Sequence, residues 1–343
     1  MAKIKFIVLI SILIIIIVLI VILLQKNNIL GFVVLNEDEQ KSNIDSKVKI
    51  AYLPIVQGLP LYLSIEKDYF KEAGIEVEAI KFDSPQLILN ALIAGQVDIG
   101  APSTASGITG VTEYKKPGEL KIFALIGDND TTTNYVLIAR NDYNLKAVKD
   151  LKNRKLGVIP GIQFRTLAQH ILAQNNLTIE KDVTLVELTP GLQLQALASG
   201  QVDAVLTLEP IRAMARLKGV GKELVEAPAL KFVSNPFYGS VGVVRAQYLK
   251  ENPEAAEKIL QVFNRAIEEI NENPDSARQY LKGYTPLDEQ LISEVPLPVF
   301  KMYQNFSKKD IDALQKWFDV FTKYGIIDGR VDAQKLVLSE DKE

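Results

Sequence analysis

An internal repeat constrains the fold of this sequence more than any other feature. Residues 49–54, Lys-Ile-Ala-Tyr-Leu-Pro, resemble residues 155–160, Lys-Leu-Gly-Val-Ile-Pro. Residues 91–98, Ala-Leu-Ile-Ala-Gly-Gln-Val-Asp, resemble residues 196–203, Ala-Leu-Ala-Ser-Gly-Gln-Val-Asp. The two pairs occur in the same order at offsets of 106 and 105 residues, which indicates that the chain contains two similar halves.

Each half alternates segments that favour strands with segments that favour helices. In the first half, apolar segments cover residues 48–53, 75–82 and 97–100, and the helical stretches between them end at Gly74 and Gly95. This alternation predicts an α/β fold with a parallel or mixed sheet in each half. Ligands bind beyond the carboxyl ends of the strands in such sheets, so two lobes that face each other would enclose a binding cleft.

The chain is expected to pass between the two lobes twice, once after each half. Residues 135–140 follow a polar loop, and residues 239–245 form a similar extended segment. We therefore expect a discontinuous first lobe over residues 48–134 plus 239–330, which includes the C-terminal helices. The second lobe covers residues 135–238, and residues 331–343 form a short tail.

The N-terminal segment is too apolar to belong to either lobe. Residues 6–24 are apolar except for Ser11, and a helix over residues 4–24 would be about 31 Å long, which matches a bilayer core of about 30 Å. A cleaved signal peptide is the alternative, but it has a shorter apolar run and a small-residue cleavage site, and no such site follows here. Lys3 and Lys5 precede the run, so the positive-inside rule places the N-terminus in the cytoplasm.

We therefore expect a single-pass cell-membrane protein with an extracytoplasmic binding domain. The anchor covers residues 4–24, and residues 25–47 form a polar tether that spans on the order of 25 Å as a coil. Such a tether would keep the outer domain near a partner in the same membrane.

Composition excludes several classes of function. The net charge of −3 provides no basic field for nucleic acid. The 343 residues include no cysteine and one histidine, which excludes thiolate and multi-histidine metal sites and a thiol nucleophile. We therefore expect no cofactor, no metal and no catalytic residue.

The motifs at residues 60–78, 91–100 and 196–204, with Glu209-Pro210 after the last, resemble a known family. They are similar to the solute-binding proteins of ABC importers in the nitrate, sulfonate, taurine and thiamine-precursor group. The resemblance implies a monomeric two-lobe protein of the type II periplasmic-binding-protein fold. Such a protein closes on a small molecule and delivers it to an ABC permease and its ATPase in the same membrane.

The sequence departs from this group in two respects that concern cysteine. Bacterial relatives often carry a lipid-anchoring cysteine, and its absence here leaves anchoring to the N-terminal helix. Enzymes of thiamine-precursor synthesis that share the fold use a cysteine-rich motif, which this chain lacks.

The loops that follow the strands contain the candidate ligand-binding residues. These are Pro54 and Gln57 after the first strand, Ser103 and Thr104 after the third, and Gln163, Phe164, Arg165 and Thr166 at the matching place in the second half. Backbone N–H groups at the start of the helix that follows Gly161 would attract an anion. The hydroxyls of Ser103 and Thr104 would donate to a ligand or cap a helix.

Arg165 is the one cation among these candidates. A positive charge in the first turn of a helix is mildly unfavourable, so Arg165 requires a partner. We expect a bidentate clamp on a sulfonate, carboxylate or phosphate, and the alternative is an exposed arginine paired with a nearby acid.

Two further candidates lie near the second crossing. Glu209 would accept a hydrogen bond from a ligand amino group, or it would cap the helix that begins at Pro210. Tyr238, like Tyr52 and Phe164, would form a stacking wall for a ring or would pack in the core.

These candidates leave the ligand open between two classes. Arg165 and the loop that carries the Ser103 and Thr104 hydroxyls favour an oxyanion of the sulfonate, taurine or nitrate type. Glu209 and the aromatic residues instead favour a heterocyclic precursor of the thiamine-pyrimidine or riboflavin type. Two other functions compete with solute binding: an enzyme on the same fold, such as the menaquinone-pathway lyases, and a sensory ectodomain.

Overall fold

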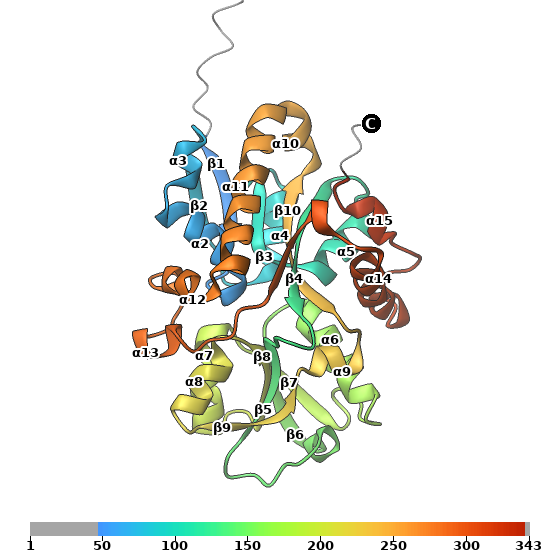
Figure 1. The fold of residues 1–343 in the computed structure, drawn as a ribbon. Helices are drawn as coiled ribbons and strands as arrows, with labels where there is room; N and C mark the ends of the chain where they lie inside the picture. Colours follow the sequence, from blue (N-terminus) through green and yellow to red (C-terminus); the bar gives the residue numbers. More distant parts are fainter. Residues whose placement is uncertain (1–46, 340–343) are drawn as a thin grey trace, which may run out of the picture. The chain divides into compact units, whose positions relative to one another are not determined.

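Two separate β-sheets organise the computed structural model, which describes residues 47–339 (Figure 1). The first sheet has the order β11-β4-β10-β3-β1-β2, and the second has the order β7-β6-β8-β5-β9. The strands of the first sheet are β1 (Val48–Tyr52), β2 (Val77–Lys81), β3 (Ile99–Ala105), β4 (Leu120–Asp128), β10 (Phe237–Arg245) and β11 (Val299–Met302). Those of the second are β5 (Tyr135–Arg140), β6 (Arg154–Val158), β7 (Val183–Glu187), β8 (Ala204–Leu208) and β9 (Gly221–Glu226).

Both sheets are mixed, and their strand pairing is equivalent. Strand β1 pairs in parallel with β2 and β3, as β6 does with β7 and β8. Strand β10 runs antiparallel between β3 and β4, as β5 does between β8 and β9. The predicted α/β class and the two similar halves are therefore confirmed.

Helices surround both sheets. Those of the first lobe, which is built on the first sheet, are α2 (Leu59–Glu66), α3 (Tyr69–Glu72), α4 (Pro85–Ile93), α5 (Ser106–Lys115), α10 (Ala246–Glu251), α11 (Pro253–Glu272), α12 (Pro274–Ala277), α13 (Glu289–Ile292), α14 (Lys308–Lys323) and α15 (Ala333–Leu336). Those of the second lobe are α6 (Ile162–Ala173), α7 (Pro190–Ser199), α8 (Ile211–Leu217) and α9 (Pro228–Phe232). Short 3-10 turns cover Val56–Gly58, Val148–Leu151, Arg278–Leu281 and Tyr303–Asn305.

Hydrogen bonds explain why the Gly-Gln-Val-Asp motif occurs in both halves. The Oδ2 atom of Asp98 accepts from the backbone N–H of Lys49 at 3.0 Å, and the Oδ2 atom of Asp203 accepts from that of Lys155 at 2.8 Å. Each aspartate therefore fixes the start of the central parallel strand of its sheet. The glycines of the two motifs have left-handed φ angles of 69° and 79°, which favour glycine over any other residue.

The two sheets are joined where β4 leads into β5 and where α9 leads into β10. The first crossing is held by Asp128, whose Oδ1 accepts from the N–H of Asn134 at 2.9 Å and whose Oδ2 accepts from that of Tyr135 at 3.0 Å. All three residues are buried. One carboxylate thus fixes both sides of the loop that connects the lobes.

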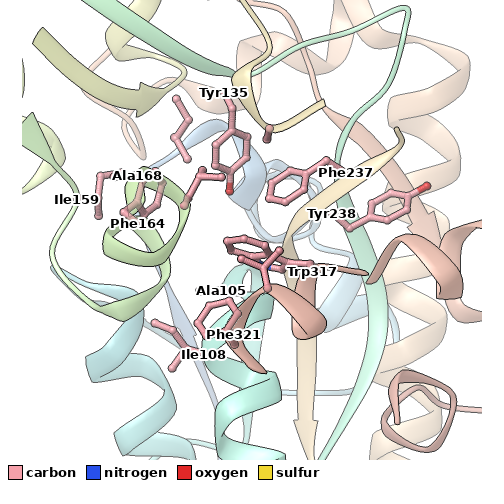
Figure 2. Packing of buried hydrophobic residues seen from close by; sticks show 14 of the residues in the cluster. Ala105, Ile108, Tyr135, Ile159, Phe164, Ala168, Phe237, Tyr238, Trp317 and Phe321 are labelled. Carbon is pink, nitrogen blue, oxygen red and sulfur yellow. The ribbon is translucent and has the colours of Figure 1, made fainter. Parts of the chain in front are cut away.

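The two faces of the first sheet carry different helices. Helices α2 and α11 pack on one face, where Ile50 and Phe263 share a core, and α5 and α14 pack on the other, with Trp317 and Phe321 of α14 buried. Figure 2 shows Trp317 between Phe237 and Phe321, with ring centroids 5.3 and 4.9 Å away. These aromatic residues of α14 are therefore core packing.

The structure describes the C-terminal end of the chain as far as residue 339 but not the N-terminal segment. Residues 331–338 do not form a free tail, because Val331, Leu336 and Val337 are buried and the N–H of Leu338 donates to the carbonyl of Ile122 in β4. The anchor expected over residues 4–24 and the tether up to residue 46 lie outside the described residues. Among the helices within residues 47–339, none combines the length and the apolar character needed to span a bilayer.

Candidate ligand site between the two sheets

A small cavity lies where the carboxyl ends of the strands from both sheets meet. Its lining comes from Leu53, Ile55, Asp83, Pro85, Ser103, Ala105 and Ser240 of the first lobe, and from Tyr135, Ile159, Gln163, Phe164, Pro190 and Leu208 of the second. We call this space the inner cavity. Its volume of about 10 Å³ is that of a single water-sized sphere, so the two lobes are in contact around it.

Gln163 joins the lobes at this cavity. It lies in the first turn of α6, after Gly161, whose φ of 108° favours glycine. Its Nε2 donates to the carbonyl of Gly239 at 2.8 Å, and its Oε1 accepts from the N–H of Gly107 at 2.7 Å. Both partners belong to the first lobe. The side chain is only 3% exposed, so it is a buried contact of the closed arrangement.

The hydroxyl of Tyr135 is an unused donor in the same place. Tyr135 lines the inner cavity and is fully buried, and within residues 47–339 its hydroxyl has no partner at hydrogen-bonding geometry, although Gln163 and Ser240 lie nearby. Burial raises its pKa, so the group stays protonated and can donate. Its ring stacks on Phe164, with centroids 5.8 Å apart. Phe164 therefore lines the cavity, and its stacking on a ligand stays a prediction.

Of the two predicted hydroxyls, only one reaches the cavity. The Oγ of Ser103 lies on the cavity and accepts from the N–H of Leu53 at 3.0 Å, so its own proton is available to a ligand. Thr104 is buried and donates to the carbonyl of Ala101 at 2.9 Å, within its own strand. Successive residues of a strand point to opposite faces, which separates these neighbours.

Three other candidates do not line the inner cavity. Gln57 and Thr166 are buried, and Gln57 Oε1 and Thr166 Oγ1 have no partner among the described residues. Pro54 lines a larger pocket nearer the surface, which is described below.

Arg165 does not enter the cleft, and the expected anion clamp is wrong for this structure. Its side chain is 45% exposed, and Nε lies 3.7 Å from Glu187 and Nη1 lies 4.0 Å from Glu180. Within this turn of α6, Gln163, Phe164 and Thr166 are buried, and Arg165 alone turns outward. The alternative of an exposed arginine paired with acids is what the structure shows.

Tyr238 also lies away from the cleft, contrary to expectation. Its hydroxyl donates to Oδ1 of Asp310 at 2.5 Å, and Figure 2 shows its ring pointing away from Phe237 and Tyr135. Alternation along β10 accounts for this, because the ring of Phe237 packs against Tyr135 and Trp317, whereas the next residue turns to the opposite side and its hydroxyl reaches Asp310. Tyr238 is a core residue of the first lobe.

Glu209 belongs to a different pocket beside the first crossing. This pocket of about 310 Å³ is also lined by Thr133, Arg212, Glu223 and Glu294. The carboxylate of Glu209 accepts from the N–H of Ala213 at 3.1 Å, which is the helix-capping alternative, and lies 3.9 Å from Arg212. Its environment is the first turn of α8, not the inner cavity. Burial raises its pKa to about 7.

A larger open pocket of about 560 Å³ adjoins the inner cavity and shares Leu53, Asp83 and Pro190 with it. We call it the outer pocket. Sequence reasoning missed its residues Tyr284, Thr189 and Pro190. The repeat contained a signal for the last two, because Ser84-Pro85 before α4 matches Thr189-Pro190 before α7 at the same 105-residue offset. Tyr284 has no counterpart in the repeat.

The chain matches a known protein family over the region that forms this site. The sequence profile described as NMT1/THI5 like matches residues 56–277, which is more than half of the chain. The chain belongs to the NMT1/THI5-like family. The match begins at the loop after β1 and includes every lining residue of the inner cavity except Leu53 and Ile55.

Relatives of this NMT1/THI5-like chain include binding proteins of known structure. It is 25% identical over 299 residues to a putative aliphatic sulfonates-binding protein of Bacillus subtilis, covering 85% of this chain and 86% of the other. The alkanesulfonate-binding protein of Xanthomonas axonopodis pv. citri bound to MOPS superposes with a TM-score of 0.69 at 18% identity, covering 85% and 98% of the two chains. The periplasmic nitrate-binding protein of Synechocystis PCC 6803 gives a TM-score of 0.68 at 15% identity, covering 85% and 86%. These structures confirm the two-lobe type II periplasmic-binding-protein fold.

Proposed function

We propose that this chain is an extracytoplasmic solute-binding protein that captures a small oxyanion of the sulfonate or nitrate type between its lobes. The observation that carries the proposal is the pair formed by Gln163, which closes the lobes, and the buried Tyr135 hydroxyl beside it. The names of the sulfonate- and nitrate-binding relatives support the same class of solute.

The inner cavity would hold an anion with neutral donors. None of its lining residues is lysine or arginine. The Tyr135 and Ser103 hydroxyls can donate, and the N–H of Gly107 in the first turn of α5 now binds the Oε1 atom of Gln163. Hydrogen bonds from neutral donors to an anion are short and strong, and helix N-termini favour negative charge. An entering oxygen would take the place of that Gln163 oxygen once the lobes part.

Delivery to an ABC permease and its ATPase is the corresponding role in the membrane. The predicted anchor at residues 4–24 would hold the binding domain beside such a permease. The chain would act as a monomer, as the resemblance to solute-binding proteins implies. Protein that stays with membranes after a salt wash and exposes its lobes to added protease on intact cells would support this topology. A mature chain released into the medium would contradict it.

The competing proposals are a heterocyclic precursor as the solute and an enzyme on the same fold. Thermal-shift measurements on the purified full-length protein separate them, using methanesulfonate, taurine, nitrate and an aminopyrimidine as probes. A ligand at about 100 times its dissociation constant stabilises the folded state by about 2.7 kcal/mol. We expect the anions to raise the melting temperature and to be recovered unchanged. A response to the aminopyrimidine alone would replace the oxyanion proposal, and chemical conversion of a bound probe would replace the binding role.

Tyr135→Phe is the sharpest single variant for this proposal. It removes a buried hydroxyl that has no hydrogen-bond partner among the described residues, so the ligand-free protein should lose no stability. The affinity for the anion should fall by about tenfold, because a charge-assisted hydrogen bond is lost. Unchanged affinity would show that the anion binds elsewhere.

A further inference from the structure

The outer pocket is far larger than the space that an oxyanion head group requires. Its volume is about 560 Å³, compared with about 10 Å³ for the inner cavity. It lies beyond the ends of β1 and β2, and Thr189, Pro190 and Gly191 at the start of α7 close its other side. The two spaces adjoin at Leu53, Asp83 and Pro190, so one solute can extend through both.

The wall of the outer pocket on the first lobe is made of tyrosine rings. Tyr52 and Tyr284 line the pocket, and Tyr62 lies buried behind them. The rings of Tyr62 and Tyr284 are stacked, with centroids 4.4 Å apart and an interplanar angle of 12°. Tyr52 meets both of these rings edge-on, at 5.6 and 6.4 Å. Tyr62 thus covers one face of Tyr284, and Tyr284 itself lines the pocket.

Hydrogen bonds hold this wall in place. The hydroxyl of Tyr62 donates to the carbonyls of Leu53 and Ile55, at 2.6 and 3.1 Å, and that of Tyr284 donates to Glu66 at 2.9 Å. The Tyr284 hydroxyl is therefore engaged away from the second lobe. A rigid aromatic surface of this kind loses little conformational entropy when it binds a second ring.

The opposite wall leaves room for a flat group. A Cβ atom added to Gly191 would meet no atom within 4 Å, so the space in front of this residue is open. Pro190 and Gly191 present no long side chain there. The charged residues on the pocket are Lys81 and Asp83, both exposed and of opposite sign, so the pocket as a whole does not select for charge.

We propose that the outer pocket binds a planar aromatic ring attached to the anionic group, so that the solute is an aryl or heteroaryl acid rather than a free inorganic oxyanion. This inference rests on the proposed function for the head group. It adds that Tyr52 and Tyr284 select the body of the solute by stacking, while the inner cavity selects its head.

The test is calorimetry on the full-length protein with three sulfonates that share one head group. Benzenesulfonate carries a flat ring, cyclohexanesulfonate a puckered ring of similar size, and methanesulfonate no ring. Benzenesulfonate should bind at least tenfold more tightly than methanesulfonate and several-fold more tightly than cyclohexanesulfonate. Equal affinities for the flat and puckered rings would overturn the proposal, because stacking would then contribute nothing.

Variants on the two walls assign the effect to this pocket. Tyr284→Ala should abolish the preference for benzenesulfonate and leave methanesulfonate binding within twofold, whereas Tyr284→Phe keeps the ring and should keep the preference. Gly191→Leu should fill the open space from the other lobe and give the same selective loss, with Gly191→Ala as its matched control. A preference that survives both Tyr284→Ala and Gly191→Leu would overturn the proposal.

Failure of the head-group assignment has a different signature. If no sulfonate binds the parent protein, the proposed function fails, and an uncharged aminopyrimidine then tests the ring pocket alone. Binding that is lost in Tyr284→Ala and retained in Tyr284→Phe would support the ring pocket. Aminopyrimidine binding that is equal in both variants, or absent from the parent, would overturn it.

Discussion

Gln163 of the second lobe donates a hydrogen bond of 2.8 Å to the carbonyl oxygen of Gly239 in the first lobe. The Oε1 atom of the same side chain accepts a hydrogen bond from the N–H of Gly107 in α5, which also belongs to the first lobe. One side chain therefore ties the second lobe to two backbone positions, both close to the inner cavity.

We predict that Gln163→Ala favours the open arrangement of the lobes. The substitution removes two interlobe hydrogen bonds, each contributing about 0.5–1.5 kcal/mol to the closed form. The radius of gyration of the ligand-free protein, measured by small-angle scattering, should increase. Gln193→Ala is the control, because Gln193 is equally buried but its bond to Thr207 stays within the second lobe. Identical scattering from the parent and Gln163→Ala would show that the contact does not hold the lobes together.

The positions of Ser103 and Arg165 predict opposite outcomes for two alanine variants. Ser103→Ala removes a hydroxyl from the inner cavity and should weaken anion binding by about tenfold. Arg165→Ala should leave affinity unchanged within twofold, since the guanidinium is exposed and paired with Glu180 and Glu187. Titration calorimetry with methanesulfonate measures both. A large loss of affinity in Arg165→Ala would contradict this prediction and would support Arg165 as an anion clamp.

Two buried carboxyls beside the first crossing predict how stability depends on pH. Burial raises the pKa of Asp128 from 3.8 to about 7 and that of Glu209 from 4.5 to about 7. Because the folded-state values lie above the unfolded ones, these groups contribute stability that is fully present below about pH 4 and is lost as the pH rises through about 7.

Glu209→Gln isolates one of these two contributions. Between pH 5 and pH 8, the difference in the free energy of unfolding should shift in favour of the variant by on the order of 2 kcal/mol. Urea unfolding at a series of pH values measures this difference. Asp128 and the single histidine, His170, titrate in both proteins, so their contributions cancel in the comparison. Parallel curves for the two proteins would mean that Glu209 is already ionised at pH 5.

Two glycines at opposite ends of α7 predict a stability difference between two superficially similar substitutions. Gly200→Ala places a Cβ on a residue with a φ of 79° and within 2.1 Å of the Arg140 guanidinium, so it should cost about 1–2 kcal/mol. Gly191→Ala lies in α7 with open space around it and should stabilise the helix by up to about 1 kcal/mol. Thermal unfolding of both variants provides the comparison. Equal melting temperatures would contradict the argument.

The sequence predicts the sheets well because the repeat and the Gly-Gln-Val-Asp motifs mark strands by local hydrogen bonding. It predicts the cleft less well, because lining a cavity depends on which way one side chain turns. The charge of Arg165 and the ring of Tyr238 make both residues candidates, yet the helical period and the strand alternation turn both away from the cleft. Tyr284 could not be found by pattern, since its place beside Tyr52 results from packing between segments more than 200 residues apart.

The equivalent strand orders of the two sheets have a consequence for how the chain can be divided. Strands β1 to β5 form one copy of the repeat and β6 to β10 the other, and Arg140 at the end of β5 corresponds to Arg245 at the end of β10. Yet β5 pairs with β8 and β9, and β10 pairs with β3 and β4. The two copies have exchanged their last strands, as partners do in a domain-swapped dimer. Neither copy can complete its sheet alone, so a chain cut between β5 and β6 would yield two fragments that fold only by recombining.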